Sequence, residues 1–323
     1  MKLGKRICAL ALCIIALAGL VPVQADAADY IDPNRECRLN ITYLGQNNAA
    51  MKNVQIDLYR VASVNKTMDY TLVGGFASYP IDLDNPGDAG WRALATTLQG
   101  YVAKDSVSAY DTGSTNLEGK ISFPNRRGSL KPGLYLVLAK QQTSGGVTYS
   151  MTPTLVALPA YNSTGDNWSY NLEIFPKYEA ISYTQRRVVK VWSDNNSTSR
   201  PTSVKVSLMK DNKLYESVVL NKDNSWRYTW RDLDPKYEWT MVEENVPFGY
   251  TVSVTRDSYT FYVTNTYSTN KSASGRGGTG TAQEVETLPQ TGQLWWPVPV
   301  LAVLGMGFIC CGEVLRRRRS HEK

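Results

Sequence analysis

Between residues 30 and 267, apolar and polar residues alternate in short runs, which is the period-two pattern of half-buried β-strands. The alternation is clear at residues 54–58 (VQIDL) and 204–208 (VKVSL). Gly, Asn, Asp and Pro separate the runs and predict turns, for example at Asp211-Asn212 and Asp223-Asn224. The pattern predicts an all-β fold built from β-sandwich domains.

One segment departs from this alternation and predicts a helix over residues 89–104, packed on the first of two domains. Its apolar residues recur at intervals of three or four positions: Trp91, Leu94, Ala95, Leu98 and Val102. We expect this stripe to belong to the core rather than to a binding site. The strand series pauses near residues 178–184, so the expected domains are 28–180 and 181–267.

The N-terminus has the order of features found in secretory signal peptides. Lys2, Lys5 and Arg6 precede an apolar run from residue 7 to 23, and the small-residue site Ala25-Asp26-Ala27 follows. We therefore expect residues 1–27 to be a cleaved signal peptide. The alternative is an N-terminal membrane anchor, for which the apolar run is short.

The C-terminal end predicts a membrane-spanning segment over residues 294–315. Trp295 and Trp296 suit one membrane interface, and the basic run 316–319 places its own end in the cytoplasm. Residues 268–287 are rich in Ser, Thr and Gly, which is typical of a flexible linker.

The charge distribution and the scarcity of cysteine and histidine limit the chemistry that residues 28–291 can carry out. Most of the formal charge of +6 belongs to the two ends, so the nearly neutral residues 28–291 give no electrostatic reason to expect nucleic acid as a partner. Cys37 is the one cysteine in this part, and His321 lies beyond the apolar span. Internal disulfides, histidine-dependent catalysis and Cys/His metal sites are thereby disfavoured, and we expect no metal, cofactor or enzyme activity. Paired carboxylates remain open as a catalytic alternative.

The pentapeptide Leu288-Pro289-Gln290-Thr291-Gly292, the apolar span and the basic tail together resemble the LPxTG cell-wall sorting signal of Gram-positive bacteria, here residues 288–323. The resemblance implies that a sortase cleaves between Thr291 and Gly292. The released Thr291 carbonyl would then be joined to peptidoglycan or to another subunit, so that only the precursor resides in the membrane. The alternative is a tail-anchored protein with a chance pentapeptide.

Residues 184–267 contain a set of distinctive segments: Val189-Lys190-Val191-Trp192, Arg200-Pro201, Asn224-Ser225-Trp226, residues 238–243 (EWTMVE), 246–250 (VPFGY) and 263–267 (VTNTY). With these segments, the region resembles the Cna B-type domain of Gram-positive adhesins and pilins. The resemblance implies a spontaneous isopeptide bond between Lys190 and Asn265, with Glu243 assisting as the only catalytic group. The alternative is an unreacted ion pair between Lys190 and Glu243.

Residues 30–178 resemble the N-terminal domain of Gram-positive pilins. The matching segments are 54–61 (VQIDLYRV), 130–137 (LKPGLYLV), 152–156 (TPTLV) and the closing 168–177 (WSYNLEIFPK). The closing segment resembles the pilin motif, which implies that Lys177 accepts the Thr291 acyl group of another copy. The alternative is an ordinary solvated lysine. The expected first strand, 38–43, has no lysine, so we expect no isopeptide bond in this domain.

These features predict two tandem immunoglobulin-like, Cna B-type β-sandwich domains, the first with an inserted helix, between a signal peptide and a sorting signal. The expected function is that of a pilus subunit anchored in the Gram-positive cell wall, whose partners are sortase, peptidoglycan and other pilin subunits. Its position as shaft, basal or tip subunit stays open. The alternative is a monomeric wall-anchored adhesin that binds a host or cell-surface ligand.

Overall fold

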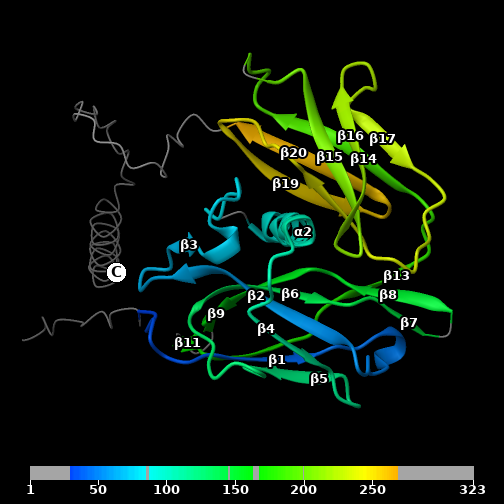
Figure 1. Cartoon of the computed structure of the whole chain (residues 1–323). Helices are drawn as coiled ribbons and strands as arrows, with labels where there is room; N and C mark the ends of the chain where they lie inside the picture. The colour runs from blue at the N-terminus through cyan, green and yellow to red at the C-terminus, as the bar shows by residue number, and fades with distance from the viewer. Residues whose placement is uncertain (1–29, 85–86, 145, 163–166, 199, 268–323) are drawn as a thin grey trace, which may run out of the picture. The chain divides into compact units, whose positions relative to one another are not determined.

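The computed structural model describes residues 30–267, apart from 85–86, 145, 163–166 and 199 (Figure 1). The expected signal peptide, the linker 268–287 and the sorting signal with its apolar span lie outside the described residues. Within the described ranges, no helix is long and apolar enough to cross a membrane. All described residues fall within one compact unit of the chain.

The N-terminal part of this unit, residues 30–181, contains thirteen strands in several small sheets. They are β1 (Arg38–Thr42), β2 (Gln55–Val64), β3 (Tyr70–Leu72), β4 (Asp111–Ser114), β5 (Lys120–Phe123), β6 (Gly133–Ala139), β7 (Gln142–Ser144), β8 (Val147–Met151), β9 (Thr154–Leu158), β10 (Ala160–Asn162), β11 (Asn167–Ser169), β12 (Asn171–Ile174) and β13 (Tyr178–Ile181). Two short 3-10 helices span Gln46–Asn48 and Gly74–Phe76.

The central sheet of this part has the strand order β3-β2-β6-β9, with β4 also paired to β2. Both of its faces are covered. Ile56 and Val137 pack into one apolar cluster with β1 and β5, whereas Val61 and Leu136 pack into another with the helix. Because β6 is buried on both sides, its sequence GLYLVLA is almost continuously apolar and does not alternate.

The predicted helix is present as α2, which spans Gly87–Asp105. It packs on the N-terminal part as expected, and it also packs on the C-terminal part, because α2 lies between two sheets (Figure 1). It contacts β6 and β9 of the N-terminal part, and it makes more extensive contacts with strands of the C-terminal part. The reason is that α2 is apolar around more than one face, so a single sheet leaves some of that surface uncovered.

The C-terminal part, residues 186–267, is a sandwich of two sheets. Its strands are β14 (Arg186–Ser193), β15 (Ser203–Lys210), β16 (Lys213–Asn221), β17 (Arg227–Trp230), β18 (Trp239–Glu243), β19 (Tyr250–Asp257) and β20 (Thr260–Tyr267). One sheet has the order β17-β14-β20-β19 and the other β16-β15-β18. The first and last strands, β14 and β20, are parallel neighbours.

The predicted turns occupy their expected places in this sandwich. Asp211 and Asn212 both have positive φ and connect β15 to β16 as a two-residue hairpin turn. Ser225 and Trp226 also have positive φ, and β17 begins directly after them, at Arg227. The described chain is thus mostly β-structure with one α-helix, which confirms the predicted fold class.

Candidate cross-linking site and acceptor lysine

Three polar side chains lie inside the C-terminal sandwich, where the pattern of alternation otherwise places apolar residues. Lys190 is 5% exposed, Glu243 is 1% exposed and Asn265 is fully buried. Lys190 follows the buried Val188 by two positions in β14, and Asn265 follows the buried Val263 by two in β20. A period of two therefore carries both side chains to the inner face of their sheet, opposite Glu243 in β18.

The three side chains meet in a connected cluster. The Asn265 Nδ2 donates a hydrogen bond to Glu243 Oε1 at 2.9 Å. The Lys190 Nζ lies 3.6 Å from Glu243 Oε2. The same Nζ donates to the backbone carbonyls of Val191 and Val263, at 3.1 and 3.0 Å. Glu243 thus bridges the amine and the amide that a cross-link would join.

Two acceptor atoms in the cluster, Glu243 Oε2 and Asn265 Oδ1, have no hydrogen-bond partner. The oxygen and nitrogen of an amide exchange places when the side chain turns by half a rotation. With the amide turned, a protonated Glu243 donates to Asn265 Oδ1 and withdraws electrons from the amide carbon. Such an arrangement pairs the orphaned amide oxygen and activates the carbon toward attack.

Burial shifts both titratable groups toward their neutral forms. Removal from water lowers the pKa of Lys190 to about 8, although the neighbouring Glu243 carboxylate acts in the opposite direction. Burial likewise raises the pKa of Glu243, against the effect of Lys190. A neutral amine is a nucleophile and a neutral carboxyl is a proton donor, so both shifts favour the species that amide exchange requires.

An aromatic cluster lies beside the amine. The Trp192 ring centroid is 4.3 Å from the Lys190 Nζ, and edge-on contacts join the Trp192 ring to those of Trp226 and Tyr250. An ion pair between Arg200 and Asp194 borders the same ring. The aromatic residues keep water from the amine and so account for part of the lowered pKa. Trp192 stands two residues after the inward-facing Lys190 in the same strand, and this spacing is the sequence signal that suggests such a contact.

The neighbouring carboxylate Glu244, which directly follows β18, has a separate environment. It accepts hydrogen bonds from Ser207 and Ser217, and it forms an ion pair with Lys205 at 2.9 Å. These bonds lower the pKa of Glu244 despite partial burial. Two consecutive residues at the end of β18 thus differ: burial favours the neutral form of the Glu243 carboxyl, whereas hydrogen bonds and Lys205 favour the ionised form of Glu244.

The predicted acceptor lysine, Lys177, lies apart from this cluster. It is in the N-terminal part of the chain, between β12 and β13. Its side chain is exposed, and its backbone carbonyl accepts a hydrogen bond from the Thr152 N–H at 2.8 Å. Pro176 before it is buried, whereas Phe175 is 64% exposed. The backbone is therefore held in place while the amine remains accessible to another molecule.

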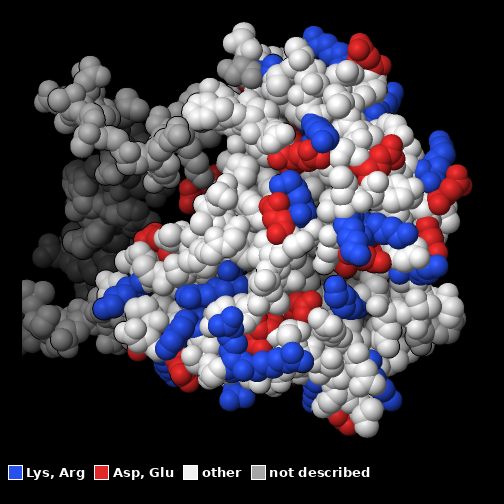
Figure 2. All heavy atoms as spheres, in the orientation of Figure 1, with Lys and Arg blue, Asp and Glu red and all other residues white. Residues whose placement is uncertain are grey.

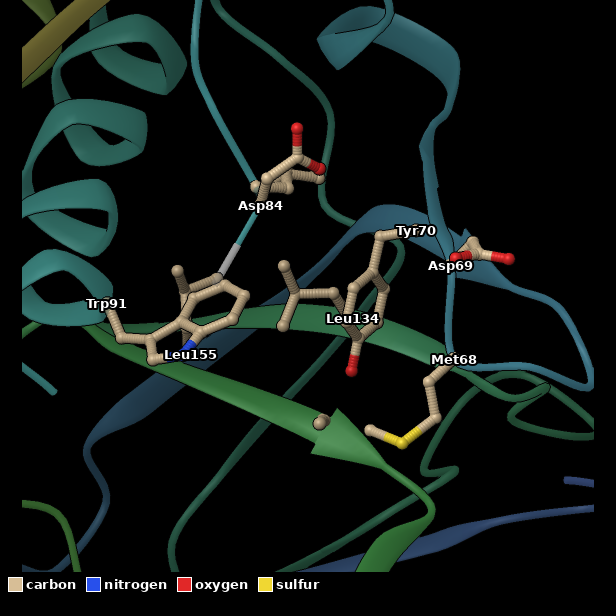
Figure 3. Close-up of a pocket in the computed structure, with 9 residues that line it drawn as sticks. Met68, Asp69, Tyr70, Asp84, Trp91, Leu134 and Leu155 are labelled. Atoms are coloured by element: carbon tan, nitrogen blue, oxygen red, sulfur yellow. The ribbon is translucent and has the colours of Figure 1, made fainter. Parts of the chain in front are cut away.

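A larger cavity of about 700 Å³ lies above the sheet beside the start of α2 (Figure 3). Leu134 and Leu155 contribute to its apolar lining, and Tyr70 meets Trp91 edge-on with 6.3 Å between ring centroids. Asp84 extends over the same space in Figure 3. No sequence motif drew attention to this cavity, because its walls come from β3, β6, β9 and α2.

The remaining predictions concern metals, charge and the sorting signal. In the part of the chain that the structure describes, no group of three or more His, Cys, Asp or Glu side chains is placed to hold a metal ion. Cys37 is buried, and burial raises the pKa of its thiol to about 11. Figure 2 shows basic and acidic side chains side by side over much of the visible face. The sorting residues Leu288, Pro289, Gln290, Thr291 and Gly292 lie outside the described residues.

Two family descriptions match adjoining parts of the chain. Residues 38–179 match the Gram-positive pilin subunit D1, N-terminal domain. Residues 186–266 match the Cna protein B-type domain. The collagen adhesin of Staphylococcus aureus is 31% identical over a region that covers 32% of this chain and 12% of that protein. The chain therefore spans a small fraction of the length of this relative.

Solved structures of surface proteins also align with the chain. The full-length major pilin SpaD from Corynebacterium diphtheriae is 16% identical, with 73% of this chain and 65% of that chain covered and a TM-score of 0.30. The shaft pilin spaA from Lactobacillus rhamnosus GG is 16% identical, with 72% and 98% covered and a TM-score of 0.26. Two B repeat units of the Staphylococcus aureus collagen-binding protein are 19% identical, with 72% and 50% covered and a TM-score of 0.26.

Proposed function

This chain carries a Gram-positive pilin subunit D1 domain followed by a Cna protein B-type domain, and from that premise we propose that it is a pilus subunit anchored in the cell wall. Lys177 is the acceptor and Thr291 the donor of the covalent joint between subunits. The observation that carries the proposal is the exposed Lys177 amine on a fixed backbone at the end of the pilin domain.

The joining reaction has two balanced steps. A sortase thiolate attacks the Thr291 carbonyl, and the Gly292 amine leaves with its C-terminal segment as an acyl-enzyme thioester forms. The neutral amine of Lys177 from another copy then attacks the thioester, the thiolate leaves, and an amide bond forms. Since donor and acceptor lie at different places on the chain, repeated joining is heterologous and produces an open-ended fibre.

An internal cross-link between Lys190 and Asn265 is the second part of the proposal. The Lys190 Nζ attacks the Asn265 side-chain carbon, Glu243 transfers protons, and ammonia leaves as the new amide forms. The burial of all three groups and the 2.9 Å and 3.6 Å contacts of Glu243 support this reaction. Each molecule reacts once with itself, so the chain is a structural protein and its own substrate rather than an enzyme.

Boiled detergent extracts of the cell wall test the proposed polymerisation. Wild-type cells should give a ladder of high-mass bands that contain this protein, and Lys177→Ala should reduce the ladder to a monomer. Lys140→Ala, which removes another exposed lysine, is the matched control and should leave the ladder intact. A ladder unaffected by Lys177→Ala would show that another amine is the acceptor.

A monomeric surface adhesin is the second candidate function. The similarity to the collagen adhesin of Staphylococcus aureus favours it, although the matched region is a small fraction of that protein. An adhesin anchored through Thr291 gives one band in wild-type cells and in both lysine variants. That result would exclude polymerisation and leave ligand binding as the function.

A further inference from the structure

We propose that the groove beside Lys177 binds the Leu288-Pro289 segment of a second copy, next to the joint between the two chains. This inference rests on the proposed function, because it assumes that Thr291 of one copy is joined to Lys177 of the next. It adds a docking surface that positions the incoming chain and later shields the joint.

The groove has a volume of about 290 Å³ and runs beside the candidate acceptor. Its lining comes from three segments that are distant in sequence. Helix α2 contributes Trp91 and Arg92, the start of β9 contributes Leu155, and the segment after β12 contributes Phe175 and Lys177. The acceptor amine therefore lies at the edge of a mostly apolar concavity rather than on a flat surface.

The apolar lining matches the residues that immediately precede the donor carbonyl. Phe175 is 64% exposed and lines the groove, so its ring offers an accessible apolar surface to Leu288. In an extended chain, Leu288 lies about 10 Å from Thr291, because each residue spans about 3.3–3.6 Å. Leu288 and Pro289 can therefore enter the groove while the Thr291 carbonyl is at the Lys177 amine.

The charges of groove and tail are also complementary. Arg92 and Lys177 are the charged residues of the groove, and both are basic. Residues 277–291 contain two acidic residues, Glu284 and Glu286, and no Lys or Arg. Acylation removes the charge of Lys177, which leaves Arg92 to attract the acidic residues.

The groove continues toward the larger cavity. Trp91 and Leu155 line both the groove and the 700 Å³ cavity of Figure 3. Asp69 and Asp84 also line that cavity, so we expect the acidic residues before Leu288 to lie near Arg92 rather than in the cavity.

Exchanging the charges of the groove and of the tail, in proteins produced in cells, tests the docking role of the groove separately from the acceptor role of Lys177. We expect Arg92→Glu to reduce the polymer fraction about tenfold, the size of a loss of about 1.4 kcal/mol in docking. Glu284→Lys with Glu286→Lys should restore the ladder in the Arg92→Glu background.

Phe175→Ser should weaken polymerisation, whereas the conservative Phe175→Leu should retain most of it. The Lys190–Asn265 mass change, measured in each variant, verifies folding.

A mixed-copy experiment identifies the occupant. Cells produce an acceptor copy with Arg92→Glu and no residues 284–292, together with a donor copy that has Lys177→Ala and the two Glu→Lys changes. Joined dimers support the second-copy tail as the occupant. If the charge exchange restores joining only when both changes are in one chain, the tail of the same chain fills the groove and the inference is wrong.

The two proposals fail in different ways. If Lys177→Ala leaves the wild-type ladder unchanged, the acceptor assignment is wrong, and the groove inference is lost with it. If Lys177→Ala abolishes the ladder while Arg92→Glu and Phe175→Ser do not change it, the acceptor stands and the groove has no docking role.

Discussion

The Thr97 hydroxyl of helix α2 accepts a hydrogen bond from the backbone N–H of Val254 in β19 at 2.7 Å. The same hydroxyl donates to the Ala93 carbonyl one helical turn earlier, also at 2.7 Å. Thr97 is 2% exposed and Val254 is 1% exposed, so water does not compete for this bond. A helix of the pilin D1 region thereby satisfies a backbone group of the B-type region.

Thr97→Val removes that acceptor with little change in side-chain volume. It should lower the free energy of unfolding by about 1–3 kcal/mol, because the buried Val254 N–H is left unpaired. Thr96→Val is the matched control, since the Thr96 hydroxyl also donates to a carbonyl one turn earlier, whereas the hydrogen bond to Val254 is made by Thr97. Denaturant unfolding of the purified variants measures both changes. Equal losses would show that the bond to Val254 contributes nothing.

Gly100 marks a close approach between α2 and β18. A Cβ at this position would lie 2.3 Å from the Met241 carbonyl oxygen, which is backbone and has little freedom to move. Gly100→Ala should therefore destabilise the protein by about 1–3 kcal/mol, even though alanine favours helix by about 1 kcal/mol. Gly128→Ala, with open space around the new Cβ, should have little effect. A stabilised Gly100→Ala variant in thermal unfolding would contradict the close packing.

The proposed Lys190–Asn265 bond closes a loop of 75 residues, from position 190 to 265. By the chain-entropy relation, its loss should lower the free energy of unfolding by about 4–5 kcal/mol. Glu243→Gln should prevent formation of the Lys190–Asn265 bond, since an amide does not shuttle protons as a carboxyl does. Glu244→Gln should leave it intact. Intact mass reports the loss of one ammonia per molecule, and retention of that ammonia in the wild-type protein would refute the cross-link.

The unlinked variant Asn265→Ala should become more stable as the pH rises through alkaline values. Burial lowers the pKa of Lys190 to about 8, whereas the ordinary value in an unfolded chain is about 10.4. The cost of burying the charged ammonium is complete below pH 8 and vanishes as the pH approaches about 10.4. The gain should be about 3 kcal/mol.

The control for this pH dependence is the double variant Lys190→Met with Asn265→Ala, which retains every other titrating group. Its unfolding free energy, measured over the same pH range, should lack the additional rise. Parallel pH profiles for the two variants would mean that Lys190 is not desolvated when it is unreacted.

Local patterns in the sequence were sufficient for the strands, the turns and the helix. Alternation at residues 54–58 and 204–208 predicts β2 and β15, and Asp211-Asn212 predicts the hairpin turn, because these features depend on neighbours along the chain. The resemblance to known domains selected Lys190, Glu243 and Asn265. Their proximity agrees with that selection, although the bond itself stays a prediction.

Tertiary structure alone decided which surfaces meet. The helical period of α2 shows that it has an apolar surface, but not that Thr97 and Gly100 contact the B-type region. The groove at Lys177 likewise combines α2 with strands far away in sequence. A period of 2 or 3.6 residues specifies which face of an element is buried. The identity of the covering element depends on long-range packing, which local periodicity does not encode.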